Sequence, residues 1–157
     1  MNNQWMPREK WNALVRGENC PLCNEVSSYE EINEHGFIIS RLKMSVLRLS
    51  LNQYVQGYCV LICNQHIREP YELAPVERQQ YFEDMTNVGE VLEKLYDPIK
   101  MNFQILGNAV PHLHCHIIPR YYGDDAPGRP IDPGAEQRLL TPEEYKLRVQ
   151  EIRAALD

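Results

Sequence analysis

The stretch VPHLHCHIIPR, Val110 to Arg120, places three histidines at every second position of an otherwise apolar run. In a β-strand, residues two apart point to the same side, at intervals of about 6–7 Å. The imidazoles of His112, His114 and His116 are therefore expected to line one face of a strand, with the apolar residues between them facing the core. The chain contains five histidines, so three in strict alternation are a specific pattern, and we interpret this face as functional.

The segments around this strand predict an α+β protein. Apolar residues recur at threes and fours from Glu77 to Tyr96, which predicts a long helix that begins near Pro75 and ends at Asp97. The last two strands are joined by the short link LGNAVP, so they should be antiparallel neighbours. We expect a mainly antiparallel five-stranded sheet packed on the long helix, with a further helix at the C-terminus. The expected strands are 37–42, 46–51, 58–63, 100–106 and 112–119, and the expected helices are 8–16, 77–96 and 141–156.

Length and composition favour one domain over residues 1–157. A chain of 157 residues is long enough for one compact core and too short for two ordinary ones. Residues 123–140 are rich in Pro, Gly and Asp and are expected to form an irregular loop.

The formal net charge of -6 argues against general nucleic-acid binding, which depends on Lys and Arg. The longest apolar run, YCVLIC, is far below the roughly 20 residues of a membrane span, and no signal sequence is visible, so we expect a cytoplasmic protein.

Two chemistries would use a row of imidazoles. They can hold a metal ion, as on the strands of cupins, or a neutral imidazole can attack phosphorus as a nucleophile. The turn at Gly107 and Asn108, just before the row, offers backbone N–H groups that can bind an anion. This turn favours a phosphate substrate.

The pair Cys20 and Cys23 has the spacing of half a zinc site. A redox motif is less well supported, because the sequence after it, NEVSSYEE, is a poor continuation of a helix. Five cysteines without an export signal also argue against a disulfide framework. The other three cysteines alternate within expected strands and are interpreted as small core residues, namely Cys59, Cys63 and Cys115.

The motif HLHCHII resembles the His-x-His-x-His-x-x pattern, with x apolar, of the histidine-triad (HIT) family of nucleotide hydrolases and transferases. The similarity extends over residues 20–122, through the CxxC pair, the GNAVP turn and IIPRY after the triad. It implies a HIT-like fold and a purine nucleotide or dinucleoside polyphosphate as substrate. It also implies that His114 attacks the α-phosphorus to give a nucleotidyl-imidazole intermediate, which water then cleaves, while His116 binds the phosphate or assists the leaving group.

The same resemblance implies roles for four further residues. Asn108 and the backbone near Ala109 would hold the non-bridging phosphate oxygens. Asn102 would reach the leaving-group side. Asn52 would accept the ribose hydroxyls, because Ser50 stands where the family often has an acidic residue or Asn.

The family also suggests how the CxxC pair is completed. His66 and His112 occupy the positions that zinc-containing HIT proteins use together with it, which implies a closed, structural zinc site of Cys20, Cys23, His66 and His112. His35 is the alternative ligand if His66 points away. The resemblance further implies a homodimer. Two other functions stay open from the sequence: a zinc-stabilised nucleotide-binding module with little catalysis, and a cupin-type metalloenzyme.

Overall fold

The computed structural model describes residues 5–132, 134 and 136–157. Residues 1–4 of the predicted domain and residues 133 and 135 of the predicted loop lie outside the described residues. The helices are α1 (Arg8–Val15), α2 (Pro21–Ser27), the 3₁₀ helix η1 (Pro70–Glu72), α3 (Pro75–Tyr96) and α4 (Pro142–Leu156). The strands are β1 (Ile32–Asn33), β2 (Gly36–Arg41), β3 (Ser45–Ser50), β4 (Cys59–Cys63), β5 (Lys100–Gln104) and β6 (His114–Arg120).

The strands form one sheet in the order β1-β2-β3-β4-β6-β5, and each neighbouring pair is antiparallel. The α+β fold class with an antiparallel sheet, a long helix and a C-terminal helix is thereby confirmed. The strand count was wrong by one among the described residues, because β1 adds a sixth strand. It has two residues, too few for any alternation of apolar and polar side chains to be visible in the sequence.

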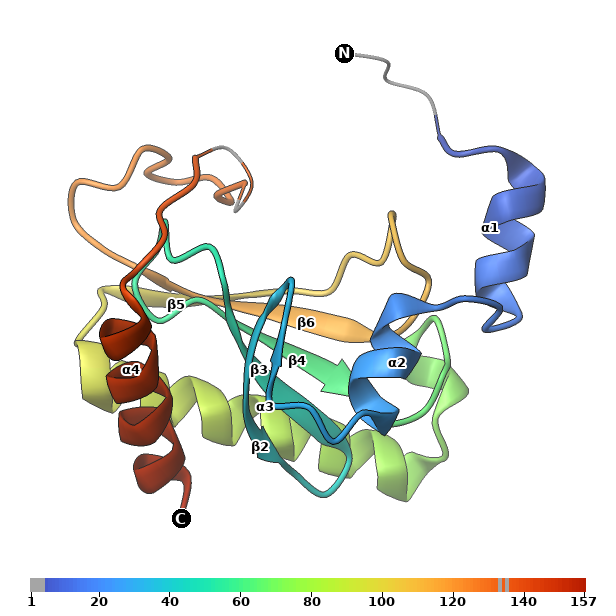
Figure 1. Cartoon of the computed structure of the whole chain (residues 1–157), viewed down its shortest axis with the longest axis horizontal. Coiled ribbons are helices and arrows are strands. Elements are labelled where there is room, and N and C mark those ends of the chain that lie inside the picture. Colours follow the sequence, from blue (N-terminus) through green and yellow to red (C-terminus); the bar gives the residue numbers. More distant parts are fainter. Residues whose placement is uncertain (1–4, 133, 135) are drawn as a thin grey trace.

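The sheet has one fully covered face. Helices α3 and α4 pack against it (Figure 1), and their buried side chains form one cluster with the inward-facing residues of β3, β4 and β6. Thr141 caps the C-terminal helix, since its Oγ1 accepts a hydrogen bond from the Glu144 amide at 3.3 Å. The three cysteines expected in the core are buried there, namely Cys59, Cys63 and Cys115.

The opposite face is covered only in part. Helix α2 lies over one end of it and Ile131 packs near the other, together with Val60, Ile62 and Ile118 of the sheet. The sequence argument against a helix after the CxxC pair was wrong, because Pro21–Ser27 is helical. A helix of seven residues has little intrinsic stability, so its packing against the sheet through Leu22 explains it better than its sequence propensity does.

The two last strands are shorter than predicted. Strand β5 ends at Gln104 and β6 begins at His114, so His112 precedes the strand rather than opening it. Within the described part of the chain, no helix has the length and apolar character required to cross a membrane.

Candidate active site and metal cluster

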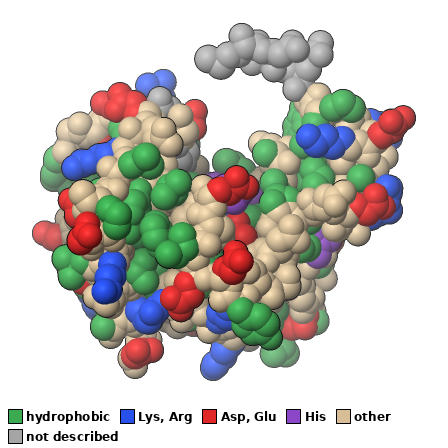
Figure 2. Space-filling model, in the orientation of Figure 1, with side chains coloured by type: hydrophobic (Ala, Val, Ile, Leu, Met, Phe, Trp, Pro, Cys, Tyr) green, Lys and Arg blue, Asp and Glu red, His purple; other side chains and the backbone are tan. Residues whose placement is uncertain are grey.

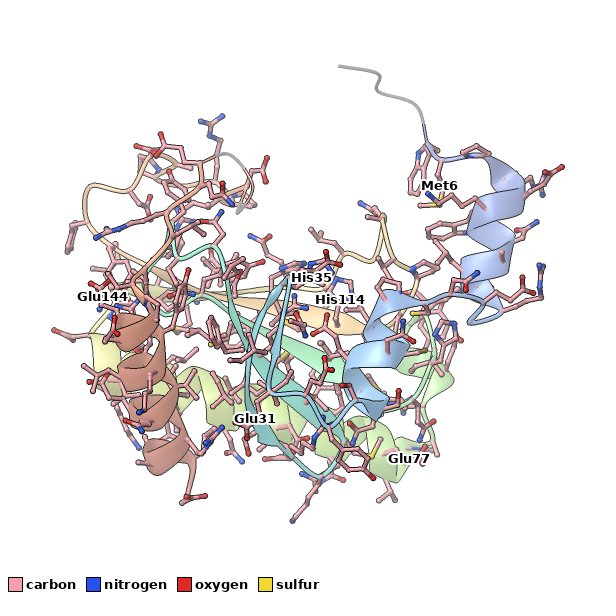
Figure 3. All side chains as sticks on the ribbon, in the orientation of Figure 1. Met6, Glu31, His35, Glu77, His114 and Glu144 are labelled. Atoms are coloured by element: carbon pink, nitrogen blue, oxygen red, sulfur yellow. The ribbon has the colours of Figure 1, made fainter. Side chains whose placement is uncertain are left out.

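The alternation of the triad segment is confirmed in space. Leu113, Cys115 and Ile117 belong to the core on the α3 side of the sheet, so His114 and His116 occupy the opposite, partly covered face. In the register of β4 and β6 they lie across from Ile62 and Val60. His114 is labelled in Figure 3, and Figure 2 shows the surface hollowed between α1 and the lobe that contains the loop after the triad.

The protonation of His114 follows from its hydrogen bond. Its Nδ1 lies 2.6 Å from the carbonyl oxygen of His112, and a carbonyl oxygen can only accept, so Nδ1 carries the proton. Burial lowers the pKa of His114 below its ordinary value, which keeps the imidazole neutral near pH 7. The lone pair is therefore on Nε2, and within the described residues Nε2 has no hydrogen-bond partner. This nitrogen has the properties of a nucleophile.

His116 stands beside His114 in a different environment. The two ring centroids are 5.1 Å apart. Burial, followed by the neighbouring His114 and Arg48, lowers the pKa of His116 to about 4, so this ring is also neutral near pH 7. Its Nδ1 is 2.6 Å from the hydroxyl of Tyr58, and Gln104 of β5 is its cross-strand neighbour on the other side.

The turn before the triad has two exposed residues whose backbone amides are unengaged among the described residues. Gly107 has a left-handed backbone with φ of 79°, a conformation that favours glycine. Asn108 and Ala109 are exposed, and among the described residues their backbone amides have no acceptor. These free N–H groups precede His114 by a few residues and are available to a bound oxyanion.

Asn102 is held by Arg120 and is not free to turn. Its Oδ1 accepts a hydrogen bond of 2.8 Å from Arg120 Nη1. Arg120 is 7% exposed and also donates to both carboxylate oxygens of Asp124 and to the carbonyls of Ala126 and Arg129, at 2.6–2.8 Å. Arg120 thus fixes the chain after the triad and holds the side chain of Asn102 by its oxygen.

Asn52 is engaged with the segment that precedes α4. Its Nδ2 donates to the carbonyl of Glu136 at 2.7 Å, and its Oδ1 accepts from the amides of Tyr54 and Arg138 at 3.0 and 2.9 Å. These bonds give Asn52 a structural function in this conformation. Its proposed contact with ribose stays a prediction.

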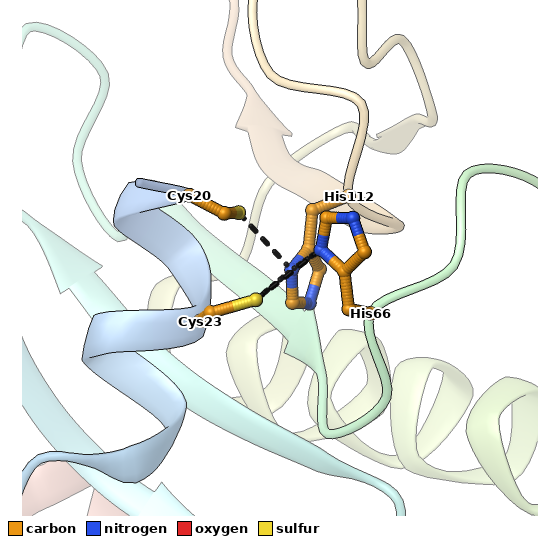
Figure 4. Close-up of side chains that lie close together, drawn as sticks. All are labelled: Cys20, Cys23, His66 and His112. Carbon is orange, nitrogen blue, oxygen red and sulfur yellow. Dashed lines mark hydrogen bonds between the residues drawn. The ribbon is translucent and has the colours of Figure 1, made fainter. Parts of the chain in front are cut away.

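Four side chains from three separate parts of the chain form a compact cluster (Figure 4). They are Cys20, Cys23, His66 and His112, and their four ligand atoms all lie within 4.8 Å of one another. The Nδ1 atoms of the two histidines are 3.3 Å apart, and three sulfur–nitrogen distances are 3.2, 3.5 and 3.5 Å. A tetrahedral zinc ion with these ligands would give edges of about 3.3 Å between nitrogens and about 3.6 Å between sulfur and nitrogen. The residues present therefore fit a metal ion.

Hydrogen bonds orient both histidines of the cluster toward its centre. His112 Nε2 donates to the carbonyl of Cys63 at 2.8 Å, and His66 Nε2 donates to the carbonyl of Val15 at 3.1 Å. Each ring then has its lone pair on Nδ1, which faces the thiols. Burial and the neighbouring Cys20 raise the pKa of Cys23 to about 11. A divalent cation would reverse this preference, because it stabilises the thiolate.

A buried ion pair lies on the same face as the histidines. Arg48 of β3 contacts Glu25 of α2, and the two residues are 8% and 6% exposed. In the sheet register Arg48 faces Val60, which in turn faces His116. Arg48 Nε and Glu25 Oε2 have no partner among the described residues. The pair joins the helix that carries the CxxC cysteines to the strand beneath the site.

Breaking this pair is expected to destabilise the protein. Arg48→Met and Glu25→Gln should each lower the free energy of unfolding by about 3–5 kcal/mol, because each leaves a buried charge or polar group without its partner. The double variant should lose less than the sum of the two single losses. Urea unfolding of the four proteins measures this coupling, and two single variants within about 1 kcal/mol of wild type would contradict it.

The sequence did not predict Tyr58, Gln104 or Arg48 as residues of this site. The sheet brings them there, because Arg48 lies on β3, Gln104 lies on β5 and Tyr58 immediately precedes β4. Tyr58 is 58 residues from His116, and no local pattern shows such a pairing.

The family model described as "HIT domain" matches residues 31–123, more than half of the chain. This chain therefore belongs to the histidine-triad (HIT) family. The match contains the triad and His66, and it begins after Cys20 and Cys23.

Individual relatives agree with this membership. The curated "Protein hit" of Bacillus subtilis is 31% identical over 123 residues, which are 71% of this chain and 77% of the relative. A histidine triad protein from Bradyrhizobium japonicum has a TM-score of 0.74 at 24% identity, over 83% of this chain and 98% of that chain, and shows the same fold. A bis(5'-nucleosyl)-tetraphosphatase (asymmetrical) of Schizosaccharomyces pombe is 29% identical over 92 residues, 55% of this chain and 50% of the relative.

Proposed function

We propose that this protein is a nucleotide hydrolase or transferase that cleaves a phosphoanhydride or phosphoramidate at the α-phosphorus, with His114 as the nucleophile. The observation that carries the proposal is the hydrogen bond of 2.6 Å between His114 Nδ1 and the His112 carbonyl. It leaves a lone pair on Nε2, and the turn at Asn108 and Ala109, a few residues earlier in the chain, would supply amides for the phosphate oxygens. The tetraphosphatase among the relatives supports a substrate of the dinucleoside polyphosphate class.

The reaction would proceed in two displacements. The lone pair of His114 Nε2 forms a bond to the α-phosphorus while the bond to the leaving group breaks, and the electron pair departs with that group. The amides near Asn108 and Ala109 would hold the non-bridging oxygens, whose charge they stabilise in the transition state. His116 would interact with the departing group. Water, or another acceptor in a transferase, then attacks the nucleotidyl-histidine and restores His114.

Release of nucleoside monophosphate tests this proposal directly. Purified protein would be incubated with diadenosine tetraphosphate and with adenosine phosphoramidate, with and without brief exposure to EDTA. Turnover that survives brief chelation supports histidine chemistry. Nucleotide binding without turnover of either substrate would instead support the alternative of a zinc-stabilised binding module.

The arrangement of the histidines disfavours a cupin-type metalloenzyme. His112 belongs to the cysteine cluster, so the triad is divided between two environments. Within the described residues, that cluster is the only group of His, Cys, Asp or Glu side chains close enough to share a metal ion, and it includes neither His114 nor His116.

We further propose that the cluster holds zinc in a structural role. Two thiols and two imidazoles on a tetrahedral frame are the donor set of structural zinc sites. When bound, the ion would join α2 to the segments that carry His66 and His112, and it would set the position of His112, whose carbonyl fixes the proton on His114. His35 is not needed as a ligand, since it is about half exposed and pairs with Glu34.

Strand β5 supports the proposal of a homodimer. It is an edge strand, and an exposed edge with apolar side chains readily pairs with another strand. Phe103 of β5, Ile99 before it and Leu95 at the end of α3 are 40%, 54% and 38% exposed. A groove of about 770 Å³ runs along β5 beside the loop after the triad. We propose that a second copy of the chain occupies this edge.

The dimer is expected to dissociate in an Ile99→Glu variant, because a charge would be placed in the apolar contact. Size-exclusion chromatography with light scattering should give twice the chain mass of 18.4 kDa for wild type and one chain mass for the variant. Tyr29→Glu is a suitable control, since Tyr29 is 99% exposed and lies away from β5. A monomeric wild type at micromolar concentration would refute the proposal.

A further inference from the structure

Tyr58 makes a close contact with His116, and the two displacements proposed above give Tyr58 no role. Its hydroxyl lies 2.6 Å from His116 Nδ1, and the two rings are stacked, with centroids 5.9 Å apart and planes inclined by 25°. Tyr58 is 6% exposed and packs with Val60 and Ile118 on the same face as His116. Its position is therefore set by the sheet and not by a mobile loop.

The direction of this hydrogen bond can be inferred. Burial raises the pKa of Tyr58 to about 12, and the pKa of His116 is lowered to about 4, so both groups are neutral near pH 7. The Ser50 hydroxyl also hydrogen-bonds to Tyr58 and lowers its pKa, as a donor to the phenol oxygen does, which leaves the phenol proton for His116 Nδ1 at 2.6 Å. The phenol therefore donates to Nδ1, and the single proton of the imidazole is on Nε2.

The two neighbouring imidazoles thus have opposite tautomers. His114 carries its proton on Nδ1, against the His112 carbonyl, and offers a lone pair at Nε2. His116 accepts at Nδ1, from Tyr58, and offers an N–H donor at Nε2. One ring can attack phosphorus while the other donates a hydrogen bond to an atom that gains negative charge.

We propose that Tyr58 is a positioning residue that holds His116 as a hydrogen-bond donor, and that it thereby selects leaving groups that depart as oxyanions. This inference rests on the proposed function. In the first displacement the P–O bond breaks and its electron pair stays on the leaving phosphate oxygen, which accepts the hydrogen bond from His116 Nε2. No proton has to be transferred, because a phosphate is stable as an anion.

An amine leaving group has a different requirement. When a P–N bond breaks, the nitrogen needs a full proton, because an amide anion is not stable in water. If a neutral His116 that is held by Tyr58 gave its Nε2 proton away, it would become an imidazolate, or Tyr58 would become a phenolate by passing its own proton to Nδ1. Burial raises the pKa of Tyr58 to about 12, so the phenolate is unfavourable near pH 7 as well. The pair of Tyr58 and His116 therefore favours phosphoanhydrides, such as dinucleoside polyphosphates, over phosphoramidates.

The test compares two substrates in three proteins. Wild type should show a kcat/KM at least about 100-fold higher for diadenosine tetraphosphate than for adenosine phosphoramidate. Tyr58→Phe should lower kcat for the tetraphosphate about 10- to 100-fold, with little change in KM, and should reduce the ratio between the substrates. Tyr81→Phe is the matched control. It removes another buried hydroxyl, one that donates to the Leu61 carbonyl on the core face, and should leave the ratio unchanged.

Nitrogen-15 NMR of the histidine rings gives an independent readout, with His116→Ala to assign the signals. The His116 spectrum should show the Nε2–H tautomer in wild type and a mixture in Tyr58→Phe. A wild type that prefers the phosphoramidate, or a Tyr58→Phe variant with unchanged kcat and ratio, would overturn the selection. An Nδ1–H tautomer in wild type would overturn the positioning role. If wild type cleaves neither substrate, the proposed function fails, and the NMR result still decides whether Tyr58 sets the tautomer.

Discussion

His114→Ala is expected to lower turnover of diadenosine tetraphosphate by at least about 1,000-fold, because the variant has no group that can form the covalent bond to phosphorus. The loss should be in kcat. Substrate affinity should change little, since the amides at Asn108 and Ala109 and the walls of the site remain. Steady-state kinetics and equilibrium binding of a nucleoside monophosphate measure the two effects separately.

A trapping experiment makes the same prediction more specific. Quenching during turnover with an alkaline denaturant, in which the acid-labile P–N bond survives, should leave one nucleoside monophosphate attached to wild type, on the peptide that contains His114, and none attached to His114→Ala. The control is His35→Ala, which removes an imidazole that is about half exposed and pairs with Glu34. It should retain the activity and the adduct of wild type. A His114→Ala protein with full turnover would end the proposal of a covalent intermediate.

The parts of this site that the sequence could predict are those that follow from local periodicity. Alternation placed the apolar residues of VPHLHCHIIPR in the core and left His114 and His116 on the other face, as the structure shows. The four members of the cluster were named from their residue types and from the family resemblance, and the fold brings them together. Both the face of the triad strand and the members of the cluster could therefore be predicted without knowing which distant strands are in contact.

The parts that were missed depend on the register of the sheet and on burial. The partnership of Tyr58 with His116 arises because β4 and β6 are neighbours. Arg120 is charged, but it is buried and satisfies the carbonyls of the loop that follows. Asn52 ties two loops together in this conformation, and its contact with ribose stays a prediction. Composition and spacing do not show these contacts.

Cys20→Ser is expected to remove most of the bound zinc and to lower the melting temperature. Structural zinc sites contribute folding free energy, on the order of 10 kcal/mol in small isolated domains. Here the fold also has a large apolar core, so we expect a smaller loss of at least about 3 kcal/mol. For a chain of this length, such a loss lowers the melting temperature by about 6–12 °C. Elemental analysis of the purified protein and calorimetry give the two values.

The zinc prediction can be separated from a general effect of substitution. His35→Ala should retain one zinc per chain and an unchanged melting temperature, whereas His66→Ala should behave like Cys20→Ser, because His66 supplies one of the four ligand atoms. Unchanged metal content in both Cys20→Ser and His66→Ala would remove the proposed site.

Brief chelation of wild type should loosen α1, since His66 Nε2 donates to the Val15 carbonyl at the end of that helix. Hydrogen exchange of the α1 amides measures this change. Initial turnover should persist under the same treatment, because His114 is not a member of the cluster and His112 keeps its hydrogen bond to the Cys63 carbonyl without the ion. Immediate loss of turnover would instead indicate a metal ion that acts on the substrate.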